Sequence, residues 1–307
     1  MRKSIIVCGD VHFRSRKPKK RIDDFLTTQI LKLSQMLFYC ENNNAPLIIA
    51  GDIFDTAVEP YWLCSMVANT IMSFKVDIFV VAGQHDLRFH TKGLKNTPLG
   101  LMLSSELMFL LEDKPDLIQD QVVYGKSWED ETPEPIEKGA ILVTHEMVVE
   151  NDKLFPGQSS HQYALSLLRR NPKYKLIISG DNHRPHIVKR KGQINLNCGS
   201  MMRSSKDQKD YKPCFYDVDV ETMDIKKIPF EIEPFDIVFD LSMIDKEEEQ
   251  KDRIDFSEYV KSIEIKNDNE RPEFRTILKE VIEEAKANKR VKSIITNIME
   301  NIKNESC

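Results

Sequence analysis

Residues 47–55 read LIIAGDIFD, and this stretch decides the fold. Its first four residues form a short apolar run of the kind that makes a buried strand, so Gly51 and Asp52 lie where the strand opens into a loop. The same order, an apolar run followed at once by side chains that include types able to bind metal ions, recurs at residues 5–12, 78–86, 141–145 and 176–183. The pattern predicts five buried strands that each end in a potential metal ligand.

Open α/β sheets bind their ligands in the crevice beyond the carboxyl ends of the strands. If the five strands lie side by side, their ends bring together one polar cluster, made of Asp10, His12, Asp52, Gln84, His85, His145, Asp181 and His183. This mixture of carboxylate, imidazole and amide groups suits Mn²⁺, Fe²⁺ or Zn²⁺ better than Ca²⁺. The ligands are too many for one tetrahedral ion, and they suit two ions roughly 3.5 to 4 Å apart that share a bridging carboxylate.

A structural role would explain any one of these residues taken alone. Four of the seven histidines belong to the cluster, however, and scattered structural histidines would show no such order. The other three, His90, His161 and His186, have no spacing that demands a function.

The chain has 307 residues, of which 41% are hydrophobic, enough for one large domain with or without a smaller appendage. Its net charge of -5 argues against a globally basic surface, so any contact with nucleic acid must come from local patches. We find no signal peptide before the first strand and no apolar run long enough to span a bilayer. The six cysteines form no C-x-x-C pattern, which favours a reducing, cytoplasmic setting.

The rest of the chain supports an α/β fold. Apolar residues recur at helical spacing over residues 22–39 and 61–74, and a further helix is expected near residues 161–170. Short runs typical of strands in hairpins follow at residues 187–190, 194–197, 214–220 and 225–230. This order predicts two sheets packed as a β-sandwich with helices outside, in a domain that spans residues 1–240.

Residues 241–270 are expected to form a linker and a small accessory segment, because the composition there becomes strongly charged. Residues 271–307 are predicted to hold a pair of short helices, each with one apolar stripe and one charged face. The pair either folds back on the domain or docks on a partner helix, and the sequence leaves both open.

A basic loop begins two residues after His12 and contains Arg14, Arg16, Lys17, Lys19, Lys20 and Arg21. Its place beside the predicted cluster would allow it to bind a phosphate backbone. Most runs of charge are simply solvated, however, and the sequence supports the two interpretations about equally. A second basic group, made of Arg203, Lys206, Lys209 and Lys212, is explained slightly better as a solvated hairpin.

Five motifs, taken in order, resemble the motif series of the calcineurin-like metallophosphoesterases: Asp10-x-His12, Gly51-Asp52-x-x-Asp55, Gly83-Gln84-His85-Asp86, His145 and Gly180-Asp181-Asn182-His183. The GDIFD stretch, the chain length and the paired C-terminal helices look most like the DNA-repair branch of this superfamily, the nuclease subunit SbcD and its phage and eukaryotic relatives. The resemblance implies a four-layer α/β/β/α sandwich, here with a small C-terminal helical extension.

The resemblance also assigns roles by position. The implied metal ligands are Asp10, His12 and His183 for one ion and Gln84, His145 and Asp181 for the other, with Asp52 as the bridge. His85 would donate a proton or a hydrogen bond to the leaving oxygen, held in orientation by Asp86.

Two positions depart from the family pattern, which usually has asparagine where this chain has Gln84 and histidine where it has Asp181. Glutamine keeps the amide oxygen but is one methylene longer, so either the ligand retracts or the second ion shifts. Aspartate adds negative charge, which favours Mn²⁺ or Mg²⁺ over Zn²⁺. Because both changes fall on the same ion, weak or optional occupancy of the second site is one expectation.

Together these implications predict metal-dependent hydrolysis of DNA phosphodiester bonds, by exonuclease or endonuclease action, with two divalent ions that are Mn²⁺ or, alternatively, Mg²⁺. The resemblance further implies a homodimer and an SbcC-like coiled-coil ATPase partner in DNA repair and recombination. Two alternatives stay open: a phosphodiesterase or phosphatase acting on nucleotides or small esters, and a metal-poor DNA-binding scaffold subunit.

Overall fold

The computed structural model of the protein describes residues 2–90, 93–150 and 161–242. The chain divides into two units, residues 1–244 and 245–307, and every described residue belongs to the first. The predicted helical pair of residues 271–307, and all of the predicted linker beyond Ser242, lie outside the described residues.

The first sheet has six strands and a mixed topology. In spatial order they are β14 (Ile225–Pro229), β13 (Cys214–Asp219), β1 (Ser4–Cys8), β2 (Leu47–Ile49), β3 (Ile78–Val80) and β4 (Phe109–Leu110). The strands from β1 to β4 run parallel, and β13 pairs antiparallel with both β1 and β14. The carboxyl ends of β1, β2 and β3 therefore point to the same edge.

The second sheet also has six strands. In spatial order they are β11 (His186–Arg190), β12 (Gln193–Asn197), β10 (Tyr174–Ser179), β7 (Ala140–Thr144), β6 (Gln121–Lys126) and β5 (Asp116–Ile118). The four inner strands are parallel, and each edge strand pairs antiparallel. A small parallel pair, β8 (Val148–Val149) and β9 (Gln162–Tyr163), follows β7 in the chain.

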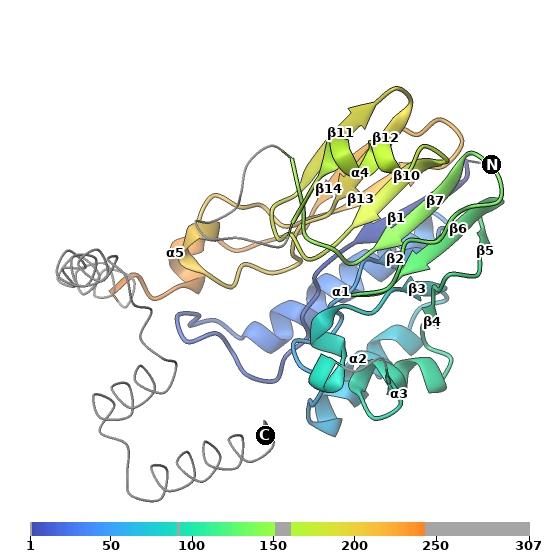
Figure 1. Ribbon diagram of the computed structural model, residues 1–307. Helices are drawn as coiled ribbons and strands as arrows, with labels where there is room; N and C mark the ends of the chain where they lie inside the picture. The colour runs from blue at the N-terminus through green and yellow to red at the C-terminus, as the bar shows by residue number, and fades with distance from the viewer. Residues whose placement is uncertain (1, 91–92, 151–160, 243–307) are drawn as a thin grey trace, which may run out of the picture. The chain divides into compact units, whose positions relative to one another are not determined.

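The alternation of side chains along each strand builds the layers, because successive residues of a strand face opposite sides of its sheet. In β1, Ile5 and Val7 join the apolar core between the two sheets, whereas Ile6 and Cys8 join the core beneath the helices. The helices of that second core are α1 (Phe25–Asn42), α2 (Tyr61–Met72) and α3 (Pro98–Ser104). Helix α4 (Ala164–Arg170) packs on the outer face of the second sheet, which completes the predicted four-layer α/β/β/α sandwich (Figure 1).

Three of the predicted helices are present with shifted bounds. Helix α1 begins at Phe25 because Asp24 caps it, accepting a hydrogen bond from the Thr27 backbone N–H at 3.1 Å. Ile22, which the apolar spacing placed inside this helix, precedes the cap and is 55% exposed. Helix α2 begins directly after Pro60, as expected.

The prediction that the five strands lie side by side is wrong, because β1, β2 and β3 belong to one sheet and β7 and β10 to the other. The two predicted hairpins also separate: β11 and β12 extend the second sheet, and β13 and β14 extend the first. The strand ends nevertheless meet, since the two sheets pack against each other through one shared core. In the part of the chain that the structure describes, no helix is both long and apolar enough to cross a membrane.

Candidate metal centre

Loops from both sheets meet at the candidate site, where hydrogen bonds join them. The His145 ring, directly after β7, donates from Nδ1 to the Ala50 carbonyl oxygen after β2, at 2.7 Å. The Asp181 backbone N–H, after β10, donates to Oδ1 of Asp10, after β1, at 2.9 Å. These bonds fix the predicted ligands of one sheet relative to those of the other.

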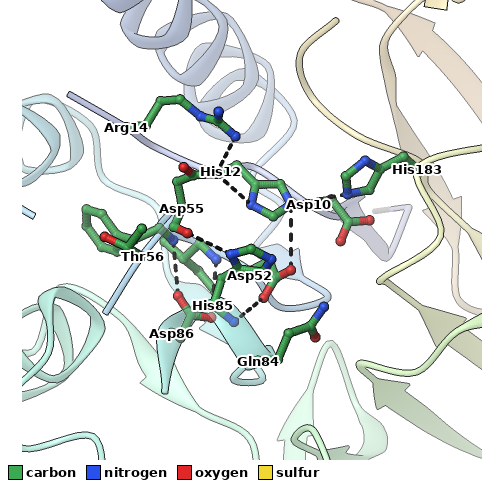
Figure 2. A network of polar contacts seen from close by, with 12 residues as sticks. Asp10, His12, Arg14, Asp52, Asp55, Thr56, Gln84, His85, Asp86 and His183 are labelled. Carbon is green, nitrogen blue, oxygen red and sulfur yellow. Dashed lines mark hydrogen bonds and ion pairs between the residues drawn. The ribbon is translucent and has the colours of Figure 1, made fainter. Parts of the chain in front are cut away.

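The first group of potential ligands contains Asp10, His12 and His183, with one ligand atom of each lying within 4.8 Å of the others. The Nε2 atoms of the two imidazoles lie only 3.2 Å apart (Figure 2). Burial lowers the pKa of His12 to about 3 and also lowers the pKa of His183, so both rings are neutral at pH 7. A neutral imidazole is the form that binds a metal ion.

The second group contains Asp10, Asp52 and His145, again with ligand atoms within 4.8 Å of one another. Oδ2 of Asp52 lies 3.3 Å from Nε2 of His145 and 3.6 Å from Nε2 of His12, so this one oxygen faces both groups. The predicted bridging role of Asp52 requires an oxygen placed in this way. Burial opposes a charge on His145, yet the surrounding carboxylates, Asp52 foremost, raise its pKa to about 10.

The two residues that depart from the family pattern contact each other. Nε2 of Gln84 donates a hydrogen bond to Oδ1 of Asp181 at 2.9 Å. This bond orients the Gln84 amide so that its Oε1 is left without a hydrogen bond in the described chain. The unusual pair therefore still presents an amide oxygen and a carboxylate oxygen as potential ligands.

The potential ligand atoms of the site fit divalent cations. Four buried atoms of the eight predicted side chains make no hydrogen bond within the described residues: Oδ2 of Asp10, Nδ1 of His12, Oε1 of Gln84 and Nε2 of His145. An unpaired buried polar atom costs free energy, and a cation bound among these atoms, displacing the proton on Nε2 of His145, would remove that cost. All eight side chains predicted from the strand ends come together here, although whether each one binds a metal stays a prediction.

The backbone is strained at several of the converging ligands. Asp10, His12, Asp52 and Asp181 have φ values of 47°, 49°, 49° and 69°, in the left-handed region that aspartate tolerates better than most residues. Gly51 has a φ of 86°, and a Cβ atom there would lie 2.2 Å from Nδ1 of His145. Only glycine lets the loop after β2 approach that ring so closely.

His85 is held differently from the prediction. Its Nδ1 donates to the Asp55 carbonyl oxygen at 2.7 Å, which leaves Nε2 as the free ring nitrogen. Asp86 does not orient the ring: its buried carboxylate accepts hydrogen bonds from the backbone N–H groups of Gly83, Ile53 and Phe54. Asp86 thus ties the loop after β3 to the loop after β2.

Asp55 also belongs to the site, although the cluster of eight residues predicted from the strand ends did not include it. Its Oδ1 lies 3.5 Å from Nδ1 of His12 and pairs with the Arg14 guanidinium (Figure 2). The spacing Asp52-x-x-Asp55 was the available signal, since it places a second carboxylate on the loop of the first. Arg14 is further fixed by Gln29 of α1, whose amide exchanges two hydrogen bonds with the Arg14 backbone.

Some residues of the basic loop are exposed, whereas Arg21 is buried and hydrogen-bonded inside the protein. Arg16, Lys17 and Lys19 are exposed, and Lys20 is half-buried. Arg21 is only 4% exposed: its guanidinium pairs with the Asp23 carboxylate and donates to the carbonyl oxygen of Arg203. The expectation that Arg21 contacts a phosphate backbone is therefore not met, because its donors are already used inside the protein.

The second basic group divides in the same way. Arg203 is buried, and its guanidinium donates to the Glu233 carbonyl oxygen. Lys209 is exposed, whereas Arg203 has no solvated face to offer. The interpretation of this segment as a solvated hairpin thus fails for Arg203.

A cleft of about 510 Å³ opens beside the ligands. Its lining includes His85, Gln84, Asp181, His183, Arg184 and Tyr211. The first four were predicted from the strand ends, whereas Arg184 and Tyr211 were not singled out. These two residues line the same cleft as the proposed ligands Gln84, Asp181 and His183.

The family model of calcineurin-like phosphoesterases matches residues 3–185, more than half of the chain and the whole of the candidate site. The protein belongs to the calcineurin-like phosphoesterase family, whose members are hydrolases that use divalent metal ions. No protein with a curated description matches the sequence significantly.

Solved structures give similar but distant matches. A protein described as a novel archaeal phosphodiesterase is 15% identical, with a TM-score of 0.42, over 74% of this chain and 99% of its own. A protein of Thermus thermophilus is 10% identical, with a TM-score of 0.47, over 75% of this chain and 99% of its own. A hypothetical protein of Pyrococcus horikoshii is 13% identical, with a TM-score of 0.43, over 81% of this chain and 93% of its own.

Proposed function

We propose that the protein is a two-metal DNA nuclease that hydrolyses phosphodiester bonds. The observation that carries this proposal is the position of Asp52 Oδ2, which faces both groups of potential ligands. Asp10, His12 and His183 would hold one cation, Gln84, His145 and Asp181 the other, and Asp52 would join them. When bound, such cations lower the pKa of a coordinated water and neutralise charge on the phosphate oxygens.

The chain's own contribution to the chemistry is His85. Its Nδ1 donates to the Asp55 carbonyl, so the ring is held at one edge and Nε2 is free to carry a proton or a hydrogen bond to the leaving oxygen. A positioned acid of this kind typically contributes about 10² to 10⁴ in rate. The mixture of oxygen and imidazole ligands supports Mn²⁺, with Mg²⁺ as the alternative.

DNA as the substrate, and SbcD-like repair and recombination as the setting, rest on the motif resemblance. The exposed charges of the basic loop support it, because their loop is tied to the site through the Arg14–Asp55 pair. We further propose a homodimer in the cytoplasm, with an SbcC-like ATPase on residues 271–307. Deleting residues 271–307 should abolish ATPase binding and leave the number of bound metal ions unchanged. Normal ATPase binding by the shortened chain would refute this docking role.

The test of the nuclease is Mn²⁺-dependent digestion of an end-labelled DNA duplex. The wild type should degrade it, and His85→Ala and Asp52→Ala should not, each variant being checked for folding by circular dichroism. Asp113→Ala, at an exposed carboxylate outside the site, is the matched control and should keep full activity. No degradation by folded wild type that contains metal would contradict the proposal.

A second candidate is hydrolysis of small phosphoesters, and the net charge of -5 favours it over an extended nucleic-acid surface. Comparing DNA with a chromogenic phosphodiester under Mn²⁺ separates the two functions. The third alternative, a metal-poor scaffold, would show one bound metal ion or none per chain and no activity with any metal.

A further inference from the structure

Arg184 is held by its backbone at the edge of the cleft. Its N–H donates to Oδ1 of Asn182 at 3.0 Å, and its carbonyl oxygen accepts from Nδ2 of Asn197 at 2.9 Å. Asn182 is anchored in turn, since its Nδ2 donates to the Val148 carbonyl oxygen. The backbone of Arg184 is thus fixed on both sides, directly after the proposed ligand His183.

The Arg184 side chain, in contrast, makes no polar contact with the described residues. It is exposed, and its guanidinium makes no hydrogen bond or ion pair with the described residues. Of the residues described as lining the cleft, it is the one lysine or arginine. Arg14, beside the proposed ligand His12, has its charge matched by Asp55.

The neighbouring wall of the cleft offers no competing positive group among the described residues. The Tyr211 hydroxyl donates to the Ser200 carbonyl oxygen, and Nε2 of Gln208 donates to the Ser200 hydroxyl. Both side chains are therefore used to shape the wall, and the charged residue beside them is Asp207. Among the described residues that line the cleft, Arg184 therefore supplies the guanidinium that an entering anion would meet.

We propose, on the basis of the proposed function, that Arg184 binds the phosphate adjacent to the scissile one, so that the preferred substrate is a polynucleotide chain rather than an isolated diester. A guanidinium stays charged at every physiological pH, and its planar fork matches two phosphate oxygens. The scissile phosphate would be bound at the proposed metal ligands, of which His183 is the last in the sequence. Arg184 follows His183 directly and lines the same cleft as the proposed ligands, so its side chain is placed to meet a second phosphate of a bound polynucleotide.

The test compares bis(p-nitrophenyl) phosphate, which has one phosphate, with a single-stranded thymidine oligonucleotide, both with Mn²⁺. Arg184→Ala should raise KM for the oligonucleotide roughly 10- to 100-fold, the usual loss for a charge-assisted hydrogen bond. Its kcat, and its kcat/KM on the small ester, should stay within about twofold of the wild-type values. The dependence of log KM on log salt should flatten by about 0.7, the value for one lost phosphate contact on a single strand.

Two further variants sharpen the result. Arg184→Lys keeps the charge without the fork, so its KM should lie between those of the wild type and Arg184→Ala. Lys189→Ala, at an exposed charge on β11, should leave KM and the salt dependence unchanged.

An unchanged oligonucleotide KM in Arg184→Ala would overturn the inference alone and leave the nuclease function standing. An equal loss on both substrates would also overturn it, because Arg184 would then serve the scissile phosphate or the fold. Hydrolysis of the small ester without any hydrolysis of the oligonucleotide by the wild type would overturn the nuclease function, and the inference with it.

Discussion

Asp86 is fully buried, and its two carboxylate oxygens accept three backbone hydrogen bonds, from Gly83, Ile53 and Phe54. Burial raises the pKa of Asp86 to about 7, while these three donors oppose the rise. The residue therefore stabilises the two loops that carry Asp52 and His85, without touching a substrate.

We expect Asp86→Ala to lower the free energy of unfolding by roughly 2 to 4 kcal/mol, because it leaves three buried N–H groups unpaired. Urea denaturation of the metal-free protein measures this change. Asp113→Ala, at an exposed carboxylate, should have little effect. A stable Asp86→Ala protein that has lost only catalysis would restore the role first expected for Asp86.

Lys32 of α1 is buried, and its ammonium donates to the Met201 carbonyl oxygen at 2.8 Å. Burial, helped by the nearby charges of Arg21 and Arg203, lowers its pKa from 10.5 to about 7. Between these two values the unfolded chain binds more protons than the folded one, so the stability contributed by this group rises with pH. It is complete above about 10.5 and is lost as the pH falls through about 7.

The difference in unfolding free energy between the wild type and Lys32→Met should accordingly shift in favour of the wild type by roughly 2 kcal/mol between pH 7 and pH 9. Urea denaturation at the two pH values measures it. Lys189→Met, at an exposed lysine, should show no such shift. A pH-independent difference for Lys32→Met would mean that its ammonium titrates normally.

The element α5 (Phe235–Val238) shows how one short helix is secured to the domain. Phe235 and Phe239 stack with ring centroids 4.1 Å apart, and the Arg21 guanidinium lies 5.1 Å from the Phe239 ring centroid. Arg203 lies over Phe235 in the same way, at 5.7 Å. The arginines that sequence placed in basic surface segments thus stabilise α5 through cation–π contacts.

Arg21→Ala should cost about 3 kcal/mol of stability, because it leaves Asp23 without its partner and removes the contact with Phe239. Thermal or urea denaturation checks this value. Lys19→Ala, two residues away and exposed, is the control and should change stability by less than about 0.5 kcal/mol. If Arg21→Ala weakened DNA binding and left stability unchanged, the surface interpretation would be right after all.

The elements that the sequence predicted best are the central parallel strands. Residues 141–144 and 176–179 are mostly apolar because both faces of β7 and β10 are covered, which makes a short run easy to recognise. Edge strand β5 was not predicted, since Leu117 is 71% exposed and gives no clear pattern. Which strands share a sheet could not be predicted either, because it depends on contacts between distant segments.

The same limit applies to the candidate site. A strand end is a local feature, so the eight residues of the predicted cluster could be found from their place after apolar runs. The contacts of Asp86, the pairing of Asp55 with Arg14 and the free side chain of Arg184 arise from tertiary structure. No spacing in the sequence distinguishes those arrangements from surface residues.

For the molecule as a whole, the contact between Gln84 and Asp181 predicts two metal sites of unequal affinity. One Asp181 carboxylate oxygen already accepts a hydrogen bond from the Gln84 amide. The metal site that these two residues share therefore has fewer oxygen atoms free to bind the ion. Calorimetric titration with Mn²⁺ should resolve a tight and a weak event. The double variant Gln84→Asn/Asp181→His should tighten the weak one roughly tenfold. Two equal sites in the wild type would contradict this expectation.

Each proposed cation would have ligands from loops of both sheets, and the hydrogen bonds between His145 and Ala50 and between Asp181 and Asp10 already join those loops. Binding of the cations would then stabilise the packing of the two sheets. At roughly 100 times its dissociation constant, an ion would add about 2.7 kcal/mol per site to the free energy of unfolding. Mn²⁺ should raise the melting temperature by about 5 °C or more, and a chelator should reverse the rise. The supply of divalent ions in a cell would thus set how long each molecule survives, as well as how fast it works.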